Sequence, residues 1–401
     1  MIALRATPSV GDRSRAEFLD DVGRTLWPPG ADAATGGSRF VVLPGLERPR
    51  LLVPAGRRVA AADVRQYGEP RTRRGRLRAR ALSLLFRSGV AGAVFRDGVE
   101  LPAGGGMASI ESYLRETVAP DLCISMYLGA PRANRKPVLQ LLRPSGELVG
   151  IAKIGITPLA RRLVDAEHAA LQLLAGHGFQ TVRPPGVLHH GEWAGMPVLV
   201  LTPLPIRARR IALLPGTLAG AMREVAEVGG APAAVPVESL VDSLIARLTA
   251  TEESLTRLAL TDGLERLRQV AGDELLQVGG WHGDWTPWNM AHTRRGLLLW
   301  DWERFGERVP VGFDAAHHWL QTNVVPGRRE PRAAAAECVR QAGGILAPLV
   351  PDAGSARITA LLYLAELASR QLADGQARSG ARLGDAARWL VPALTEQVAA
   401  L

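Results

Sequence analysis

WHGDWTPWNMAHTRRGLLLWDWE, residues 281–303, is the most informative segment of the chain. It places a His-Gly-Asp turn five residues ahead of Asn289 and ends an apolar run at Asp301. Asn289 opens an alternating segment, Arg-Arg-Gly at 294–296 supplies a turn, and the apolar run has the pattern of a buried returning strand. Counted outward from the turn, Asn289 and Asp301 lie opposite each other at the open end of a hairpin. Asp284 lies on the loop that leads into the same end.

These residue types fit the chemistry of phosphoryl transfer. One carboxylate can accept the proton of an attacking hydroxyl group, and oxygen-bearing side chains can hold magnesium. A His-Gly-Asp turn alone, or an Asp at a strand end alone, is common without any function. The joint spacing of Asp284, Asn289 and Asp301 is much less common, and we expect these three side chains to converge on one site.

The composition is typical of a globular protein. The chain has 401 residues, 47% of them hydrophobic and 22% charged, which is enough for two or three domains. No apolar stretch approaches the roughly 20 residues of a membrane span, and the first residues have no apolar signal core. Cys123 and Cys338 are far apart and show no metal-type spacing. A reduced, cytoplasmic protein is therefore the simplest expectation.

The net charge of +9 arises almost wholly from arginine, since only Lys136 and Lys153 are lysines among 48 basic residues. A lysine ammonium group is a compact point charge that suits a phosphate and one carboxylate. Lys153 lies in the strand-like segment 148–154, which follows two further strand-like segments at 122–128 and 137–143 through short loops. The pattern predicts an antiparallel sheet with Lys153 on its third strand.

The next segment, residues 158–177, predicts a helix with an apolar stripe that includes Leu163 and Leu171. Glu167 lies four residues from each of them, within the stripe. A buried carboxylate is costly unless it is paired, and Lys153 is the expected partner. The alternative is a glutamate that only borders the core.

The connection at 129–136 is a candidate cover for phosphate groups. It has one glycine and no G-x-G-x-x-G pattern, but it contains three cations. Arg135 and Lys136 are the cations that we expect to contact phosphate oxygens by charge. A solvated basic hairpin tip is the alternative.

The motifs HGDWTPWN, LLLWDWE and, at 312–317, GFDAAH together resemble the aminoglycoside phosphotransferase and choline kinase superfamily. The resemblance implies an α+β, two-lobed protein-kinase-like fold, with an antiparallel sheet and a helix in the N-lobe and a mainly helical C-lobe. It assigns the N-lobe to residues 106–204 and the C-lobe, with the catalytic loop and acceptor site, to residues 205–401. Residues 1–105 are left as an N-terminal α/β extension of unknown role.

The resemblance also implies roles for the residues above. Asp284 is the catalytic base, and Asn289 and Asp301 are magnesium ligands. Lys153 holds the α- and β-phosphates of ATP, and Glu167 positions it.

Four more positions take supporting roles. His282 belongs to the catalytic loop as a hydrogen-bonding residue rather than as an acid or base. By the resemblance, Asp314 braces the His-Gly-Asp turn through backbone bonds; the alternative is a plain helix N-cap. Glu303 points the same way as Asp301 on an extended chain and adds a contact at the metal site. The backbone from Leu201 to Leu204 is the expected hinge that binds adenine.

Two features bear on ligands other than ATP. Trp285 and Trp288 flank the catalytic loop, where aromatic faces suit sugar rings or cationic groups. The arginine-rich run at 71–87 has the pattern of a basic amphipathic helix, which can meet a membrane surface or an acidic partner. The alternative for this run is a solvated face, and we expect no nucleic-acid partner because no such motif is present.

We therefore expect a magnesium- and ATP-dependent phosphotransferase that acts on a hydroxyl of a small molecule: an aminoglycoside, a sugar, an amino alcohol or a natural-product intermediate. A polycationic aminoglycoside needs an acidic pocket, and the C-lobe offers only scattered acids such as Glu253, Asp262 and Glu307. The alternative is a non-catalytic nucleotide-binding module that acts through its N-terminal domain. The motifs do not distinguish ATP from GTP and do not indicate an oligomeric state.

Overall fold

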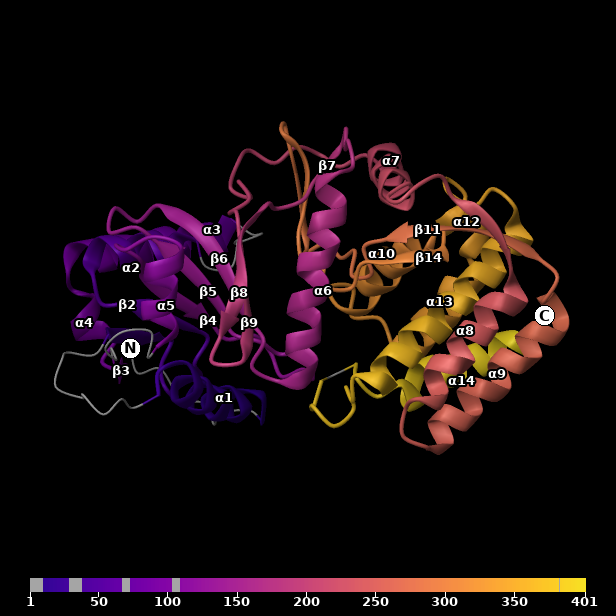
Figure 1. Cartoon of the computed structure of the whole chain (residues 1–401), viewed down its shortest axis with the longest axis horizontal. Helices are drawn as coiled ribbons and strands as arrows, with labels where there is room; N and C mark the ends of the chain where they lie inside the picture. The colour runs from indigo at the N-terminus through magenta and orange to yellow at the C-terminus, as the bar shows by residue number, and fades with distance from the viewer. Residues whose placement is uncertain (1–9, 29–37, 67–72, 103–108, 382) are drawn as a thin grey trace. The chain divides into compact units, whose positions relative to one another are not determined.

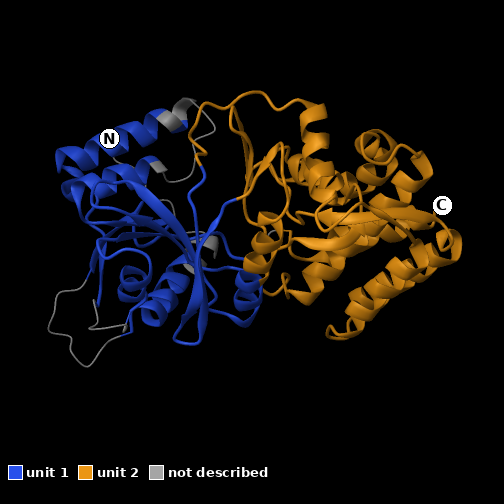
Figure 2. Ribbon diagram, turned by 45° about the horizontal axis from the view of Figure 1, so that its top comes forward, with its two compact units in different colours: residues 1–165, 185–204 blue, residues 166–184, 205–401 orange. Residues whose placement is uncertain are grey.

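The computed structural model describes residues 10–28, 38–66, 73–102, 109–381 and 383–401. The chain forms two compact units, which Figure 2 colours separately. Unit 1 consists of residues 1–165 and 185–204, and unit 2 consists of residues 166–184 and 205–401. The passage between Leu204 and Pro205 coincides with the expected lobe boundary, whereas residues 166–184 group with unit 2. The expected boundary at 105/106 lies outside the described residues.

Unit 1 is built on one eight-stranded antiparallel sheet, with the strand order β3-β1-β2-β4-β5-β6-β9-β8. The predicted meander of three strands is confirmed as β4, β5 and β6. The strands are β1 (Ser38–Leu43), β2 (Leu51–Pro54), β3 (Gly98–Leu101), β4 (Cys123–Tyr127), β5 (Val138–Leu142), β6 (Leu148–Ile154), β8 (Val187–Trp193) and β9 (Met196–Leu201).

The described part of residues 1–105 is continuous with this sheet. Strand β2 pairs with β4 through Leu51–Tyr127 and Leu52–Met126, and β1 and β3 extend the sheet beyond β2. The extension is therefore part of unit 1, because its strand β2 satisfies backbone groups on β4 of the following segment. Its helices are α1 (Val10–Leu26), α2 (Arg57–Gln66), α3 (Arg73–Ser88) and α4 (Ala91–Val94), and α5 (Ile110–Thr117) follows.

Helices cover both faces of the sheet, as the alternation of side chains along a strand requires (Figure 1). Leu52 and Ile124 point to the face that packs against α1 and α5. Leu51 and Val53 point to the opposite face and pack against α2, α3 and α4. On that second face the hydroxyl of Ser125 donates to the buried carboxylate of Asp63 on α2, with 2.8 Å between Oγ and Oδ1.

Unit 2 is mainly helical, as expected for the C-lobe. Its helices are α7 (Pro215–Ala226), α8 (Val237–Thr249), α9 (Leu255–Ala271), α10 (Phe313–Val324), α11 (Pro331–Arg340), α12 (Ala342–Leu346), α13 (Ala353–Ala373) and α14 (Ala386–Val398); α6 (Pro158–Ala175) begins in unit 1 and continues into unit 2. Both units together confirm the α+β class.

Two small sheets lie within unit 2. In one, β11 (Leu275–Trp281) pairs on either side with β10 (Ala233–Pro236) and β14 (Gly306–Pro310). In the other, β13 (Gly296–Leu299) lies between β12 (Met290–Thr293) and β7 (Val182–Arg183). The strands β12 and β13 form the predicted hairpin, which places Asn289 and Asp301 just beyond its open end.

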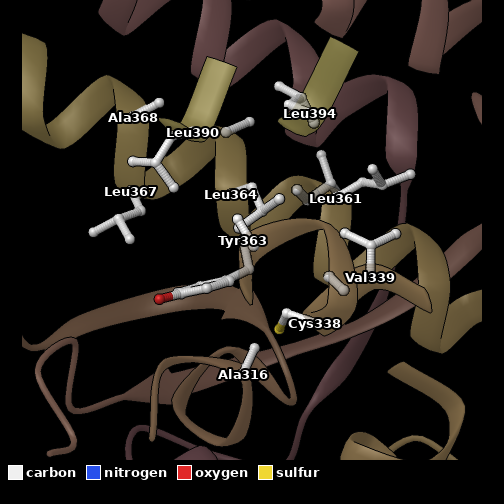
Figure 3. Packing of buried hydrophobic residues seen from close by; sticks show 14 of the residues in the cluster. Ala316, Cys338, Val339, Leu361, Tyr363, Leu364, Leu367, Ala368, Leu390 and Leu394 are labelled. Carbon is white, nitrogen blue, oxygen red and sulfur yellow. The ribbon is translucent and has the colours of Figure 1, made fainter. Parts of the chain in front are cut away.

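The largest core of unit 2 surrounds α13. Leu361 and Leu364 pack there with Leu390 and Leu394 of α14, and Figure 3 shows these side chains side by side. Tyr363 projects from the same helix, and its hydroxyl oxygen points away from these leucines. The core therefore positions a polar group as well as filling space. No described helix has both the length and the apolar content to cross a membrane.

We expect Leu361→Ala to lower the free energy of unfolding by about 2–5 kcal/mol, since the side chain is fully buried and its removal leaves a cavity. The matched control is Leu255→Ala on α9, which removes an exposed leucine and should change stability by less than about 0.5 kcal/mol. Urea denaturation followed by tryptophan fluorescence measures both. Equal costs for the two variants would contradict this assignment of the core.

Candidate active site

The His-Gly-Asp turn follows directly after β11. Its glycine, Gly283, has a φ of +81°, in the left-handed region that favours glycine. A Cβ atom at this position would lie 2.1 Å from the carbonyl oxygen of Arg304. Only glycine allows this turn and this close approach together, so the turn is specified by its middle residue.

Asp314, in the first turn of α10, holds the turn in place. Its Oδ2 accepts the backbone N–H of His282 at 2.7 Å, and its Oδ1 accepts that of Gly283 at 3.1 Å. The carboxylate is buried. The backbone bonds that the resemblance implies are therefore present, while the N-cap position of α10 is occupied by Gly312.

His282 is fully buried and both of its ring nitrogens are engaged. Nδ1 accepts the backbone N–H of Asp284 at 3.1 Å, and Nε2 donates to the carbonyl oxygen of Trp300 at 3.1 Å. Burial lowers the pKa of His282 to about 4. These contacts match a neutral, structural histidine of the loop, as the sequence led us to expect, and leave no nitrogen for acid or base catalysis.

Asp284 and Asn289 lie side by side. The Asn289 amide nitrogen donates to Asp284 Oδ2 at 2.9 Å and to the Asp284 carbonyl oxygen at 3.0 Å. The amide oxygen of Asn289 is the atom left to act as a metal ligand. Asn289 is also fixed by the hairpin, because its carbonyl oxygen accepts the N–H of Trp300 at 3.0 Å.

A buried histidine and tyrosine hold the second oxygen of Asp284. His317 Nε2 lies 3.0 Å from Asp284 Oδ1, and His317 Nδ1 lies 3.0 Å from the hydroxyl of Tyr363. A carboxylate can only accept, so the Nε2 atom carries the proton, and the tyrosine hydroxyl donates to Nδ1. Burial lowers the pKa of His317 and raises that of Tyr363, which agrees with both rings being neutral.

Asp284 itself remains ionised at neutral pH. Burial, and to a smaller extent the charge of Asp301, act to raise its pKa, but the hydrogen bond from His317 and the charge of Arg370 act to lower it, and the net pKa lies below the usual value. Its side chain keeps 28% of its surface exposed. The arrangement therefore presents a charged, partly accessible carboxylate.

Arg370 completes the support of the turn from α13. Its Nη1 donates to the carbonyl oxygen of Gly283 at 2.7 Å. The guanidinium group also lies 5.7 Å from the centre of the Trp281 ring, at the distance of a cation–π contact. Both backbone groups of Gly283 are thus bonded to side chains from two different helices.

Three carboxylates gather beside the turn. Glu167 of α6, Asp301 and Glu303 each offer an oxygen atom, and these atoms lie within 4.8 Å of one another. Asp301 has a φ of +73°, an uncommon conformation for a residue other than glycine. Glu167 also accepts the backbone N–H of Trp302 at 3.3 Å.

Like charges at this spacing repel, and carboxylate oxygens are the ligands that hard divalent cations prefer. The donor set therefore fits magnesium. Sequence reasoning singled out Asp301 and Glu303 for this cluster, but it assigned Glu167 to Lys153 alone.

Unit 1 contains the residues expected to bind nucleotide. Lys153 lies on β6, where it pairs with Val138 and Leu199 of the neighbouring strands, and it is largely buried. Leu201 is the last residue of β9 and Leu204 is the last residue of unit 1. The pairing of Lys153 with Glu167, which belongs to unit 2, stays a prediction, as does the binding of adenine at the hinge.

In the basic connection at 129–136, Arg135 was expected to contact phosphate oxygens, but it lies against an aromatic ring. The guanidinium carbon of Arg135 lies 3.8 Å from the centre of the Phe18 ring on α1. Burial, and then the charge of Arg15, lower the pKa of Arg135 to about 10. This guanidinium group is packed on an aromatic ring, which we did not expect. For Lys136 the contact with phosphate stays a prediction.

A cavity of about 650 Å³ opens in unit 2, and its lining does not include Asp284, Asn289 or Asp301. Trp281, Phe305 and Phe313 give it aromatic walls, and Ser239, Ser243 and Ser369 contribute hydroxyl groups. The cavity reaches the turn through Arg370, which lines it.

The acids of this cavity are largely paired with arginine. Arg304 and Asp374 form an ion pair at 2.5 Å, and Arg247 pairs with Glu366. The remaining acid among the lining residues is Glu307, and Arg308 lies next to it. The cavity is therefore not acidic overall.

The two tryptophans of the catalytic loop, Trp285 and Trp288, differ in burial. Trp285 is fully buried, and its ring centre lies 6.0 Å from that of His282. The expectation that it walls an acceptor site is therefore wrong, because its ring is part of the packing under the loop. Trp288 is half-buried and remains a candidate wall.

Three residues of the site were not predicted. His317 ends the motif GFDAAH, three residues after Asp314. Residues at this spacing lie on the same face of a helix, and this was the signal in the sequence that could have placed His317 at the site. Tyr363 and Arg370 are seven residues apart, two turns of one helix, within an otherwise apolar pattern. Their role depends on tertiary contacts that helix periodicity does not specify.

Comparison with known proteins gives structural similarity only. No protein-family model matches the chain, and no curated protein matches it. Among solved structures, the chain is similar to aminoglycoside phosphotransferase APH(4)-Ia in a complex with ADP and hygromycin B, at 13% identity over 72% of this chain and 98% of that one, with a TM-score of 0.47. It is also similar to the choline kinase LicA from Streptococcus pneumoniae, at 15% identity over 73% and 99%, with a TM-score of 0.45.

A choline/ethanolamine kinase family protein from Mesorhizobium loti matches at 15% identity over 67% of this chain and 85% of that one, with a TM-score of 0.39. Similarities of this size do not assign an activity to the chain. Any functional conclusion has to come from the residues of the site.

Asp314 gives a prediction for the pH dependence of stability. Burial raises the pKa of Asp314 from 3.8 to about 7, although its two backbone hydrogen bonds act to lower it. Between about pH 4 and pH 7, the Asp314 carboxyl group therefore keeps its proton in the native state but has lost it in the unfolded chain. The contribution of Asp314 to the free energy of unfolding falls as the pH rises through this range. In Asp314→Asn the group cannot titrate.

The difference in unfolding free energy between the wild-type protein and Asp314→Asn should therefore shrink as the pH rises from about 4 to about 7. Urea denaturation of the two proteins at several pH values measures this difference. A difference that stays constant, or grows with pH, contradicts the raised pKa.

Proposed function

We propose that the chain is a magnesium- and ATP-dependent phosphotransferase that transfers the γ-phosphoryl group of ATP to a hydroxyl group of a small molecule. The observation that carries this proposal is the ionised carboxylate of Asp284, which His317 and Asn289 hold in one orientation beside three clustered carboxylates. A module that only binds nucleotide needs the metal ligands but has no need for an oriented proton acceptor.

In the proposed reaction, Asp284 orients the hydroxyl group of the acceptor and takes its proton. The acceptor oxygen forms a bond to the γ-phosphorus while the bond from that phosphorus to the β,γ-bridging oxygen breaks, and ADP leaves. Because His317 donates to Asp284 Oδ1, the carboxylate stays ionised until the hydroxyl arrives. The rate advantage of such a site comes mainly from positioning and charge stabilisation.

Magnesium would be held by Asn289 and Asp301, with Glu167 and Glu303 as the other oxygen donors close by. When bound, the metal neutralises charge on the phosphate oxygens. The left-handed conformation of Asp301 supports this role, because strained residues persist where the surrounding structure and the function require them. Lys153 and the hinge residues Leu201 and Leu204 would bind the phosphates and the adenine.

We propose that the acceptor binds in the cavity that Arg370 joins to the turn, and that its reacting hydroxyl extends beyond the cavity to Asp284, which is not among the lining residues. The chemistry of the cavity then limits the acceptor class. Its aromatic and hydroxyl lining suits a polyhydroxylated ring. Asp374 and Glu366 already pair with arginines, so they do not provide the acidic surface that a polycationic aminoglycoside needs. We therefore place neutral sugars, sugar-like alcohols and uncharged natural-product intermediates ahead of aminoglycosides.

Asp284→Asn is the direct test of the proposed base. The variant should bind magnesium-ATP as well as the wild-type protein and lose turnover by about 10²–10⁴-fold, because the amide cannot take the proton. Calorimetric titration measures binding, and ADP release with an accepted substrate measures turnover. Unaltered turnover would remove Asp284 from the mechanism.

Asp301→Asn tests the metal site. It should raise the magnesium concentration needed for half-maximal turnover by about 10-fold or more, because a neutral amide is a weaker ligand than a carboxylate. The matched control is Asp262→Asn, an exposed carboxylate of α9, which should leave the magnesium dependence unchanged. The same magnesium dependence in both variants rules out Asp301 as a ligand.

A further inference from the structure

Helix α3 has apolar side chains on two opposite faces. On the inner face, Leu82 and Phe86 pack against the core that lies between α2 and the sheet. On the outer face, Leu77 and Leu84 are 63% and 65% exposed. They lie seven residues apart, which is two helical turns, with Ala81 exposed between them. The helix therefore presents an apolar stripe to solvent as well as one to the core.

Further along the chain, the segment after α3 also has exposed apolar side chains. Val90 and Val94, in the segment that contains α4, are 52% and 56% exposed. Isolated exposed aliphatic residues are ordinary, but four exposed aliphatic residues within 77–94 are a concentration that needs an explanation.

Arginines border the stripe on both sides. At about 100° per residue, Arg80 and Arg87 lie on one flank of the line through Leu77 and Leu84, and Arg78 lies on the other. All three are exposed. Arginines of α2 at positions 57, 58 and 65 are exposed as well. Arg71, at the start of the predicted amphipathic run, lies outside the described residues.

Acidic side chains that could neutralise these arginines are almost absent from the described part of this segment. Among the described residues from 48 to 96, Asp63 is the one acidic residue, and it is fully buried with its carboxylate bonded to Ser125. The outer surface of α2 and α3 is therefore cationic. The arginine-rich composition of the chain accounts for the cations, but it does not account for two leucines on the solvent face of the same helix.

We propose that the outer face of α3, together with the exposed Val90 and Val94 that follow it in the chain, docks on an anionic lipid bilayer. An interfacial helix buries an apolar stripe at the boundary of headgroups and acyl chains, while arginines beside the stripe extend to the lipid phosphates. Leu77 and Leu84 supply that stripe here, and the arginines of α2 and α3 supply the charge complementarity.

A lipid bilayer is favoured over a nucleic acid as the partner of this surface. Nucleic acids bind cations through their phosphates and bind planar side chains by stacking, but they give no favourable environment to aliphatic leucines on the contact face. The proposal concerns unit 1 alone and is independent of the chemistry of Asp284. It gives the N-terminal extension a role, which is to bring the protein to a membrane surface.

Sedimentation of the full chain with lipid vesicles tests the proposal. The protein should sediment with vesicles that contain phosphatidylglycerol at low salt, stay in solution with vesicles of phosphatidylcholine alone, and be released from the anionic vesicles at high salt. The double variant Leu77→Ser with Leu84→Ser should weaken binding to the anionic vesicles by about tenfold or more, since it removes the apolar contribution.

The control is Leu255→Ser with Leu258→Ser, which replaces two exposed leucines of α9 and should bind as the wild-type protein does. Circular dichroism verifies that both variants are folded. Failure of the wild-type protein to bind anionic vesicles at low salt overturns the proposal. Undiminished binding of the Leu77/Leu84 variant to the anionic vesicles overturns it as well, because the surface then acts by charge alone.

Discussion

The bidentate contact between Asp314 and the His-Gly-Asp turn is the interaction on which the rest of the site depends. Two buried backbone N–H groups donate to this one carboxylate, and loss of a partner for a buried polar group costs about 1–3 kcal/mol each. The contact fixes the direction in which the chain leaves β11. That direction determines where Asp284 lies and how the Asn289 amide reaches it.

The same turn is coupled to the helical core of unit 2. Tyr363 and Arg370 both come from α13; one bonds to the histidine that holds Asp284, and the other bonds to the carbonyl of Gly283. Helix α13 is in turn fixed by the leucines packed around it (Figure 3). A rotation of this helix would therefore move the partners of the turn, so packing far from the surface sets the orientation of the proposed base.

Local patterns predicted the hairpin, the three-strand meander and the helix at 158–177, which the structure has as Pro158–Ala175. Each depends on side-chain alternation or helical periodicity within a short segment. They did not predict that β1 to β3 join the same sheet, since strand pairing across the chain has no local signal. They also missed His317 and Tyr363, whose roles arise from a tertiary contact. Glu167 was recognised as a buried carboxylate, yet its place beside Asp301 and Glu303 followed only from the structure.

The most direct test of the central claim is to incubate the protein with magnesium and ATP labelled in the γ-phosphoryl group, together with neutral sugars, amino alcohols, aminoglycosides and fractionated cell extract. Mass spectrometry then identifies labelled products, and ADP release is followed in parallel. Our account predicts a small-molecule product heavier by one labelled phosphoryl group, formed by the wild-type protein and absent with Asp284→Asn. Tight binding of magnesium-ATP without a labelled product from any fraction would contradict the proposed transfer and would favour a module that only binds nucleotide.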